Sequence, residues 1–103
     1  MKLSMVVPLF NEEQALEAFY RAVRQEPSLQ GMRVEIIFIN DGSTDRTEVI
    51  ARQLVWADPD VVLINFSRNF GKEPALFAGL EYASGEAVVP IDVDLQDPVS
   101  VIG

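Results

Sequence analysis

The chain contains no cysteine and no histidine among its 103 residues. Without cysteine it forms no disulfide and carries out no thiolate chemistry. Without histidine it lacks the commonest general base and any triad of the Ser-His type. No apolar run approaches the ~20 residues that a membrane-spanning helix needs, so we expect a soluble chain with no transmembrane segment.

Positive charge is also scarce. Lysine and arginine together number 8, against 16 aspartate and glutamate residues, which gives a net charge of −8 and an isoelectric point near 4.3. A nucleic-acid backbone is therefore a poor partner. A chain this acidic needs a metal ion or local basic residues to bind a phosphorylated ligand. With 49% hydrophobic and 23% charged residues, the composition is that of one small globular domain.

Glycine-rich phosphate loops are missing as well. Neither G-x-G-x-x-G nor a Walker A sequence follows the first apolar segment, at residues 3–8. This disfavours a dinucleotide oxidoreductase and a P-loop NTPase. Phosphate binding would instead depend on a metal ion, with Lys72 and Arg68 as candidate cations.

The chain does contain a regular alternation of apolar and amphipathic segments. Short apolar runs predict buried strands at residues 3–8, 34–40, 61–66 and 87–91. Helical spacing of apolar residues predicts a helix between each pair of strands. This order predicts an α/β fold, with an open, mostly parallel sheet, right-handed crossovers and helices on both faces.

Capping residues indicate where the helices begin and end. Asn11 is an N-cap residue type with Gln14 as its capping-box partner, which predicts a first helix reaching to about residue 26. Ser or Thr at 43–44 is expected to cap the second helix, and Gly85 to end the third. The residues expected to face the core from the second and third helices are Val49, Ile50, Leu54, Ala57, Leu76, Phe77, Leu80 and Ala83.

The alternation stops after the fourth predicted strand, because nothing beyond Asp97 is long enough for another helix. That strand would lack its crossover and leave apolar sheet surface uncovered. We therefore expect residues 1–103 to be the N-terminal half of a larger catalytic domain. One alternative is a complete four-stranded domain, and another is a homo-oligomer that forms through the exposed flank of the sheet.

Three carboxylates follow the fourth predicted strand: Asp92, Asp94 and Asp97. Clustered carboxylates repel one another unless a cation lies between them, and hard oxygen ligands suit Mg²⁺, Mn²⁺ or Ca²⁺. One hypothesis is therefore a divalent-metal site, and the simpler alternative is an acidic strand-to-loop turn, with Asp97-Pro98 as ordinary turn chemistry. In the predicted topology, the ends of the first, second and fourth strands meet at one crevice.

Four segments resemble the family 2 inverting glycosyltransferases of the GT-A fold. They are VVPLFNEE at 6–13, NDGSTDRT at 40–47, RNFGK at 68–72 and DVDLQDP at 92–98. More narrowly, they are similar to the polyprenyl-phosphate sugar transferases, namely dolichol-phosphate mannose synthases and bacterial bactoprenol glucosyltransferases. The last segment, with its Asp-x-Asp start, is the most specific to that group.

The resemblance implies a site with two parts. Residues at positions that hold the nucleotide-sugar donor are Pro8, Phe10, Glu12, Ile39, Asp41, Lys72 and Val93. Residues at the metal positions, for Mg²⁺ or Mn²⁺, are Asp92, Asp94 and Gln96. Each assignment has a structural alternative: Pro8 and Phe10 could end a strand and cover the core, Asp41 could cap the second helix, and Lys72 could be a solvated loop charge.

The resemblance also implies an activity for the longer protein. It would transfer a sugar, with glucose from UDP-glucose favoured, to a polyprenyl phosphate at the cytoplasmic face of the inner membrane. Alternatives are a GDP-mannose transferase of the dolichol-phosphate-mannose-synthase type and a non-catalytic nucleotide-binding or interaction module. Because the family's remaining catalytic groups lie further along the chain, we assign no catalytic residue and expect these residues to be inactive alone.

Overall fold

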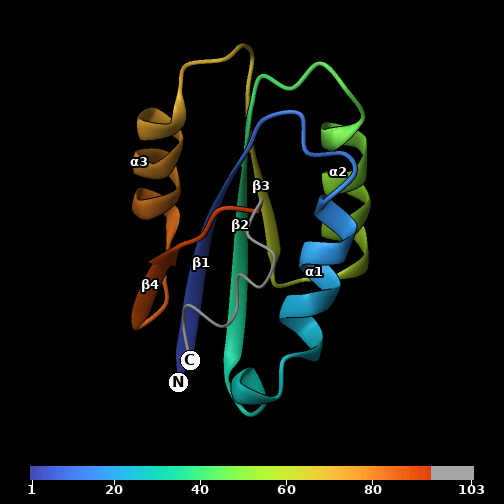
Figure 1. The fold of residues 1–103 in the computed structure, drawn as a ribbon. Helices are drawn as coiled ribbons and strands as arrows, with labels where there is room; N and C mark the ends of the chain where they lie inside the picture. Colours follow the sequence, from blue (N-terminus) through green and yellow to red (C-terminus); the bar gives the residue numbers. More distant parts are fainter. Residues whose placement is uncertain (94–103) are drawn as a thin grey trace.

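The computed structural model describes residues 1–93 (Figure 1). Its elements, in chain order, are β1 (Lys2–Leu9), α1 (Leu16–Gln25), the 3₁₀ turn η1 (Pro27–Leu29), β2 (Arg33–Asp41), α2 (Thr47–Ala57), β3 (Val61–Phe66), α3 (Lys72–Tyr82) and β4 (Ala87–Pro90). The four predicted strands are all present, and their ends agree with the prediction to about one residue. None of the helices in residues 1–93 combines the length and apolar character that crossing a bilayer requires.

The four strands form one parallel sheet in the order β3-β2-β1-β4. Figure 1 shows α1 and α2 on one side of this sheet and α3 on the other. The prediction of a parallel sheet with helices on both faces is thus confirmed. The chain adds β2 and β3 to one side of β1 and β4 to the other, so the strand order reverses between β1 and β4. In open α/β sheets, ligands bind outside the carboxyl ends of the strands at such a reversal.

The core has two parts, one on each face of the sheet. The larger part lies under α1 and α2, and the smaller lies under α3, around Val6, Ile37, Ile39 and Ala75. Helix α3 approaches the sheet closely, because a Cβ atom on Gly79 would lie 2.3 Å from Val6 Cγ1.

Two helical faces differ from the prediction. On α3, Phe77 and Leu80 are 64% and 49% exposed rather than buried. The helix turns its small residues to the sheet, which lets it pack closely. On α2, Val49 and Ala57 are exposed, and Ala51 is buried instead.

The single tryptophan of the chain is also on α2, at position 56, and its side chain is 92% exposed. Helix α2 begins just after the carboxyl end of β2. Trp56 is the penultimate residue of this helix, so it lies toward the opposite edge of the sheet. It is therefore remote from the edge at which ligands are expected.

The predicted helix caps were wrong. Helix α1 begins at Leu16, not after Asn11, and α2 begins at Thr47 without a side-chain cap from residues 43–44. Helix α3 ends at Tyr82, so Gly85 is not its cap. A Cβ atom on Gly85 would lie 2.7 Å from the backbone nitrogen of Ser4, so close packing on β1 explains this glycine.

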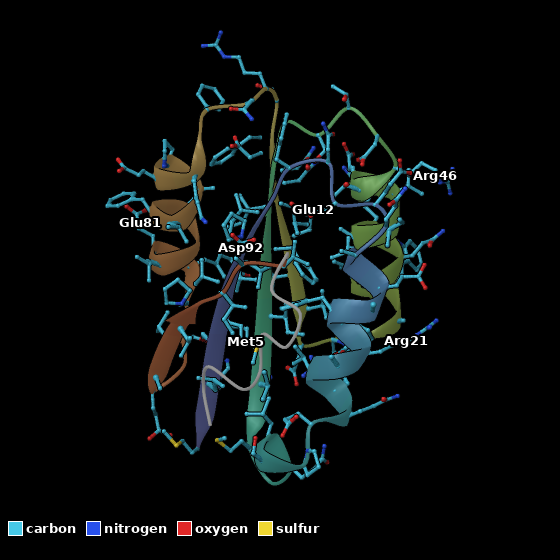
Figure 2. All side chains as sticks on the ribbon, in the orientation of Figure 1. Met5, Glu12, Arg21, Arg46, Glu81 and Asp92 are labelled. Carbon is cyan, nitrogen blue, oxygen red and sulfur yellow. The ribbon has the colours of Figure 1, made fainter. Side chains whose placement is uncertain are left out.

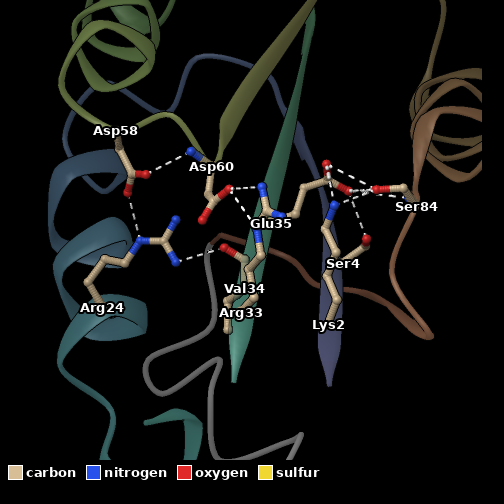
Figure 3. A network of polar contacts seen from close by, with 9 residues as sticks. All are labelled: Lys2, Ser4, Arg24, Arg33, Val34, Glu35, Asp58, Asp60 and Ser84. Atoms are coloured by element: carbon tan, nitrogen blue, oxygen red, sulfur yellow. Dashed lines mark hydrogen bonds and ion pairs between the residues drawn. The ribbon is translucent and has the colours of Figure 1, made fainter. Parts of the chain in front are cut away.

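A buried polar network holds the amino-terminal edge of the sheet together (Figure 3). Glu35 Oε1 accepts hydrogen bonds from Ser4 Oγ at 2.8 Å and from Ser84, while Lys2 Nζ lies 3.6 Å from Glu35 Oε2. Ser4 Oγ also accepts from the backbone N–H of Gly85. Burial raises the pKa of Glu35, but the hydrogen bonds from Ser4 and Ser84 and the charge of Lys2 lower it by more, so it lies below its usual value.

A second network ties α1 to β2 and to the turn before β3. Asp58 Oδ2 accepts from Tyr20 Oη at 2.7 Å and from Arg24 Nε at 2.8 Å. Arg24 Nη1 donates to the carbonyl oxygen of Val34, and Figure 3 shows this arginine reaching between Asp58 and β2. Burial raises the pKa of Asp58, but the hydrogen bond from Tyr20, the N–H of Asp60 and the charge of Arg24 together lower it below its usual value.

Candidate functional site

A cleft of about 220 Å³ opens at the carboxyl edge of the sheet. Its lining residues are Pro8, Leu9, Phe10, Glu12, Asp41, Asn69, Gly71, Lys72 and Asp92. They come from the end of β1, the end of β2, the β3–α3 loop and the segment after β4. Figure 2 shows Glu12 and Asp92 between α3 on one side and the α1–α2 pair on the other. Segments that are distant in sequence therefore meet where the strand order reverses.

Phe10 and Pro8 form the β1 side of the cleft. Pro8 is the penultimate residue of β1 and is half-buried, whereas Leu9 beside it is buried in the core. Phe10 lies just past the strand and its side chain is 45% exposed. The ring is thus not a cover for the core, and it offers an apolar face to a ligand.

The turn after Phe10 is held by the segment that follows β2. The N–H of Asn11 donates to Ser43 Oγ at 2.9 Å, and Asn11 Oδ1 accepts from the N–H of Thr44 at 2.8 Å. The N–H of Glu12 donates to Thr47 Oγ1 at 2.8 Å. Asn11 has φ +53°, a left-handed conformation in which asparagine is enriched. Glu12 therefore enters the cleft from a turn that long-range hydrogen bonds define.

Asp45 stabilises this turn by accepting hydrogen bonds from Glu13 and Thr47. Its Oδ1 accepts from the N–H and the hydroxyl of Thr47, and its Oδ2 accepts from the N–H of Glu13 at 3.3 Å. Burial raises the pKa of Asp45, but the hydrogen bonds from Thr47 and Glu13 lower it by more, so the carboxylate form is favoured. Sequence reasoning missed Asn11, Asp45 and Thr47 as supports of the site. The unusual tolerance of asparagine for positive φ was the available signal for the first.

The end of β2 contacts the β3–α3 loop directly. Asp41 is 4% exposed, and its two carboxylate oxygens accept from the N–H of Phe70 at 2.7 Å and the N–H of Gly71 at 3.0 Å. The alternative that Asp41 caps α2 is therefore wrong. Gly42 has φ +73°, and a Cβ atom there would lie 2.3 Å from the backbone nitrogen of Asn69. The two loops thus touch backbone to backbone.

Lys72 and Asp92 form an ion pair in the cleft, with Lys72 Nζ 3.0 Å from Asp92 Oδ2. Lys72 is therefore not an isolated solvated charge. Arg68 is different: its guanidinium lies 4.9 Å from the ring centroid of Phe70, outside the lining of the cleft. That ring in turn packs edge-on against Phe66 at 5.5 Å.

Two predicted donor-site residues do not reach the cleft. Ile39 is fully buried under α3, and Val93 is 3% exposed in the core on the other face of the sheet. Their side chains pack in the core, and their place in the donor site stays a prediction. Two predicted metal ligands, Asp94 and Gln96, lie outside the described residues.

The metal site can be tested only on its first ligand. Residues 1–93 contain no group of three or more acidic or other metal-binding side chains that could hold an ion. Asp92 does present a carboxylate to the cleft, and oxygen donors of this type fit a hard divalent cation. The described part of the chain thus supplies one suitable ligand at the predicted place.

Known proteins are similar to this chain in sequence and in fold. Residues 4–103 match the family model described as Glycosyl transferase family 2. The Bactoprenol glucosyl transferase of Shigella phage SfV is 63% identical over 102 residues, which cover 99% of this chain and 33% of that protein. The chain thus spans about a third of the length of the curated relatives that it matches.

Solved structures agree with the sequence relatives. The mannosyltransferase PcManGT from Pyrobaculum calidifontis, in complex with GDP-Man and Mn²⁺, superposes with a TM-score of 0.78 at 28% identity, over 89% of this chain and 27% of that one. S. aureus TarS 1-349 in complex with UDP gives 0.75 at 25% identity, over 91% and 28%. The sheet order, the spacing of the motifs and the match along nearly the whole chain lead to one conclusion: the chain belongs to glycosyl transferase family 2, with the GT-A architecture.

Proposed function

We propose that these residues form the donor-binding half of a glycosyltransferase domain, in which the cleft binds a nucleotide sugar. One observation carries the proposal most strongly. Six residues predicted from separate motifs, namely Pro8, Phe10, Glu12, Asp41, Lys72 and Asp92, line a single cleft at the strand-order reversal. Phe10 offers a ring face to a base, and the carboxylate of Glu12 is an acceptor for base N–H groups or ribose hydroxyls.

The diphosphate would lie toward Lys72 and Asp92. Lys72 supplies a local positive charge in a chain of net charge −8. Asp92 would hold Mg²⁺ or Mn²⁺, together with the proposed ligands Asp94 and Gln96. When bound, such an ion offsets the negative charge of a leaving nucleoside diphosphate as a Lewis acid. The Mn²⁺ and GDP-Man in the PcManGT structure support this assignment.

We favour UDP-glucose as the donor and a polyprenyl phosphate as the acceptor, at the cytoplasmic face of the inner membrane. The support is the 63% identity to proteins named bactoprenol glucosyl transferases. A GDP-mannose donor is the second candidate, because a GDP-mannose-bound mannosyltransferase is among the similar structures. No catalytic residue is proposed within residues 1–103, and we expect no turnover from them alone.

Calorimetric titration of the chain with UDP and with GDP, each with and without Mn²⁺, tests the proposal. We expect metal-dependent binding that Asp92→Asn weakens about tenfold or more, because losing a charge-assisted contact costs about 1.5–3 kcal/mol and a tenfold change in affinity is about 1.4 kcal/mol. Asp60→Asn is the matched control, because Asp60 pairs with Arg33 at the far edge of the sheet.

The outcomes separate the candidates. Tighter binding of UDP supports the glucosyl donor, and tighter binding of GDP supports the mannosyl donor. Metal-dependent binding without sugar transfer by the longer protein would favour the non-catalytic module. Equal loss in Asp92→Asn and Asp60→Asn would contradict the assigned site.

A further inference from the structure

We propose that Asp41 is a positioning residue: it holds the β3–α3 loop by its backbone and thereby places Lys72 beside Asp92. The resemblance assigned Asp41 to the nucleoside, and Asp41 does line the cleft; in addition, each of its carboxylate oxygens accepts a hydrogen bond from the main chain of the β3–α3 loop. The inference rests on the proposed function only in taking a nucleoside diphosphate as the ligand that Lys72 meets.

The carboxylate of Asp41 is buried and takes its hydrogen-bond donors from the protein. Asp41 is 4% exposed, so its charge needs partners inside the protein. The N–H groups of Phe70 and Gly71 supply one donor to each oxygen, at 2.7 and 3.0 Å. Hydrogen bonds to an ionised acceptor are stronger than those between neutral groups. The loop backbone is therefore fixed to the end of β2 at two consecutive residues.

Two glycines, Gly42 and Gly71, fix the conformation of the β3–α3 loop around that contact. Gly42 follows Asp41 directly, and its α-carbon lies against the backbone of Arg68 and Asn69, where no side chain would fit. Gly71 has φ +102° and is the residue immediately before α3. The carboxylate also lies by the amino terminus of α3, where a negative charge is favoured by the helix dipole.

Lys72 connects this loop to the cleft. Lys72 is the first residue of α3, one position after the Gly71 N–H that Asp41 holds. Its side chain is long and 61% exposed, so its own packing does little to direct it. Its ammonium group nevertheless lies 3.0 Å from Asp92, which follows β4 on the other side of β1. The fixed start of α3 is what brings Lys72 within reach.

The test compares Asp41→Asn with Asp58→Asn by NMR of the labelled chain without ligand. Asp58 is a matched control because its carboxylate, 15% exposed, likewise accepts a main-chain N–H, but at the opposite edge of the sheet. We expect Asp41→Asn to speed amide exchange of Phe70 and Gly71 about tenfold or more and to shift the Lys72 side-chain signals. Asp58→Asn should lower stability and leave these signals in place.

A double-mutant cycle on affinity for UDP with Mn²⁺ distinguishes positioning from direct contact. If Asp41 acts through Lys72, Asp41→Asn and Lys72→Gln each weaken binding, and the double variant is little weaker than either one. Independent losses that multiply would show direct contact and overturn the proposal. So would unchanged amide exchange at Phe70 and Gly71 in Asp41→Asn.

Two further outcomes are covered by the design. If Asp41→Asn does not fold, the scalar coupling across the hydrogen bond from the Phe70 nitrogen to the Asp41 carboxyl carbon is measured in the unmodified chain. Its presence supports the proposal, and its absence overturns it. If the unmodified chain binds no nucleotide, the proposed function fails, while the exchange rates and the Lys72 signals still decide whether Asp41 positions the loop.

Discussion

At the scale of single residues, Lys72 forms an ion pair with Asp92, the one proposed metal ligand within the described residues. Its ammonium lies where an ion on Asp92 would feel repulsion, and the side chains of Lys72 and Asp92 are 61% and 41% exposed. Water screens such a pair, so its own contribution to stability is small. In the proposed site the pairing would matter more for binding, because Lys72 would compete with a metal for Asp92 and would attract a diphosphate.

Lys72→Gln should therefore have opposite effects on two ligands. Without nucleotide, Mn²⁺ affinity should rise about two- to fivefold, because a screened like charge is removed. With Mn²⁺ present, UDP affinity should fall. Calorimetry at two salt concentrations measures the Mn²⁺ and the UDP affinities. Arg21→Gln, which changes an exposed side chain on α1, is the control. A change of the same sign for both ligands would refute the competition.

Gly42 and Gly31 offer a second test at this scale. Both have positive φ, but a Cβ on Gly42 would strike the backbone of residues 68 and 69, while Gly31 faces open space. Gly31→Ala should lower the free energy of unfolding only by the cost of a left-handed alanine, about 1–2 kcal/mol. Gly42→Ala should lower the free energy of unfolding, measured by urea denaturation, clearly more than Gly31→Ala does. It should also weaken nucleotide binding. Equal losses would mean that the loop contact is not tight.

At the scale of elements, strands were far easier to predict than helix faces. Continuous apolar runs define β1 to β4 almost to the residue, because both faces of a parallel sheet are buried. The apolar residues of α3 misled the prediction, since Phe77 and Leu80 outweigh Ala75 and Gly79 in hydrophobicity but not in fit. Asn11 was misassigned because its partner, Thr44, lies 33 residues away.

Gly79→Ala tests the close approach of α3. In an exposed helix this change would stabilise by about 1 kcal/mol through helix propensity. Here the new methyl would lie 2.3 Å from Val6 Cγ1 and 2.8 Å from Ile39 Cδ1, so we expect a net loss of stability in urea denaturation. Ala78→Gly on the same helix provides the propensity reference. A gain in stability would show that α3 can move away from the sheet at little cost.

At the scale of the whole molecule, acid should unfold the chain from both edges of the sheet. The pKa values of Glu35, Asp45 and Asp58 all lie below their usual values. The unfolded chain then binds more protons than the folded one as pH falls. The stability that these carboxylates contribute is complete above their unfolded pKa values and is lost progressively below about pH 5.

The urea midpoint should therefore be flat near pH 7 and fall steeply toward pH 3. Glu35→Gln should lower stability at pH 7 and make the pH dependence shallower, because that residue no longer gains a proton. Glu48→Gln on α2, an exposed partner of Arg52, is the control. Parallel curves for Glu35→Gln and the unmodified chain would contradict the lowered pKa of Glu35.

The location of the site could be predicted for those residues whose position follows from the sheet topology alone. Parallel strands end at one edge, so residues after β1, β2 and β4 had to meet there, and Glu12, Asp41 and Asp92 do. Topology does not say whether a side chain points into a cleft or into the core, which is why the burial of Ile39 and Val93, two predicted donor-site residues, was not foreseen. The buried role of the Asp41 oxygens also depends on a loop 29 residues away.

Trp56 has a practical consequence for all of these measurements. Its indole, the only one in the chain, is already surrounded by water and lies away from the cleft. Its fluorescence emission should resemble that of an unfolded chain, so the intrinsic signal will report neither denaturation nor nucleotide binding. Phe10→Trp in a Trp56→Phe background would move the fluorophore to the cleft, where a stacked base should quench it.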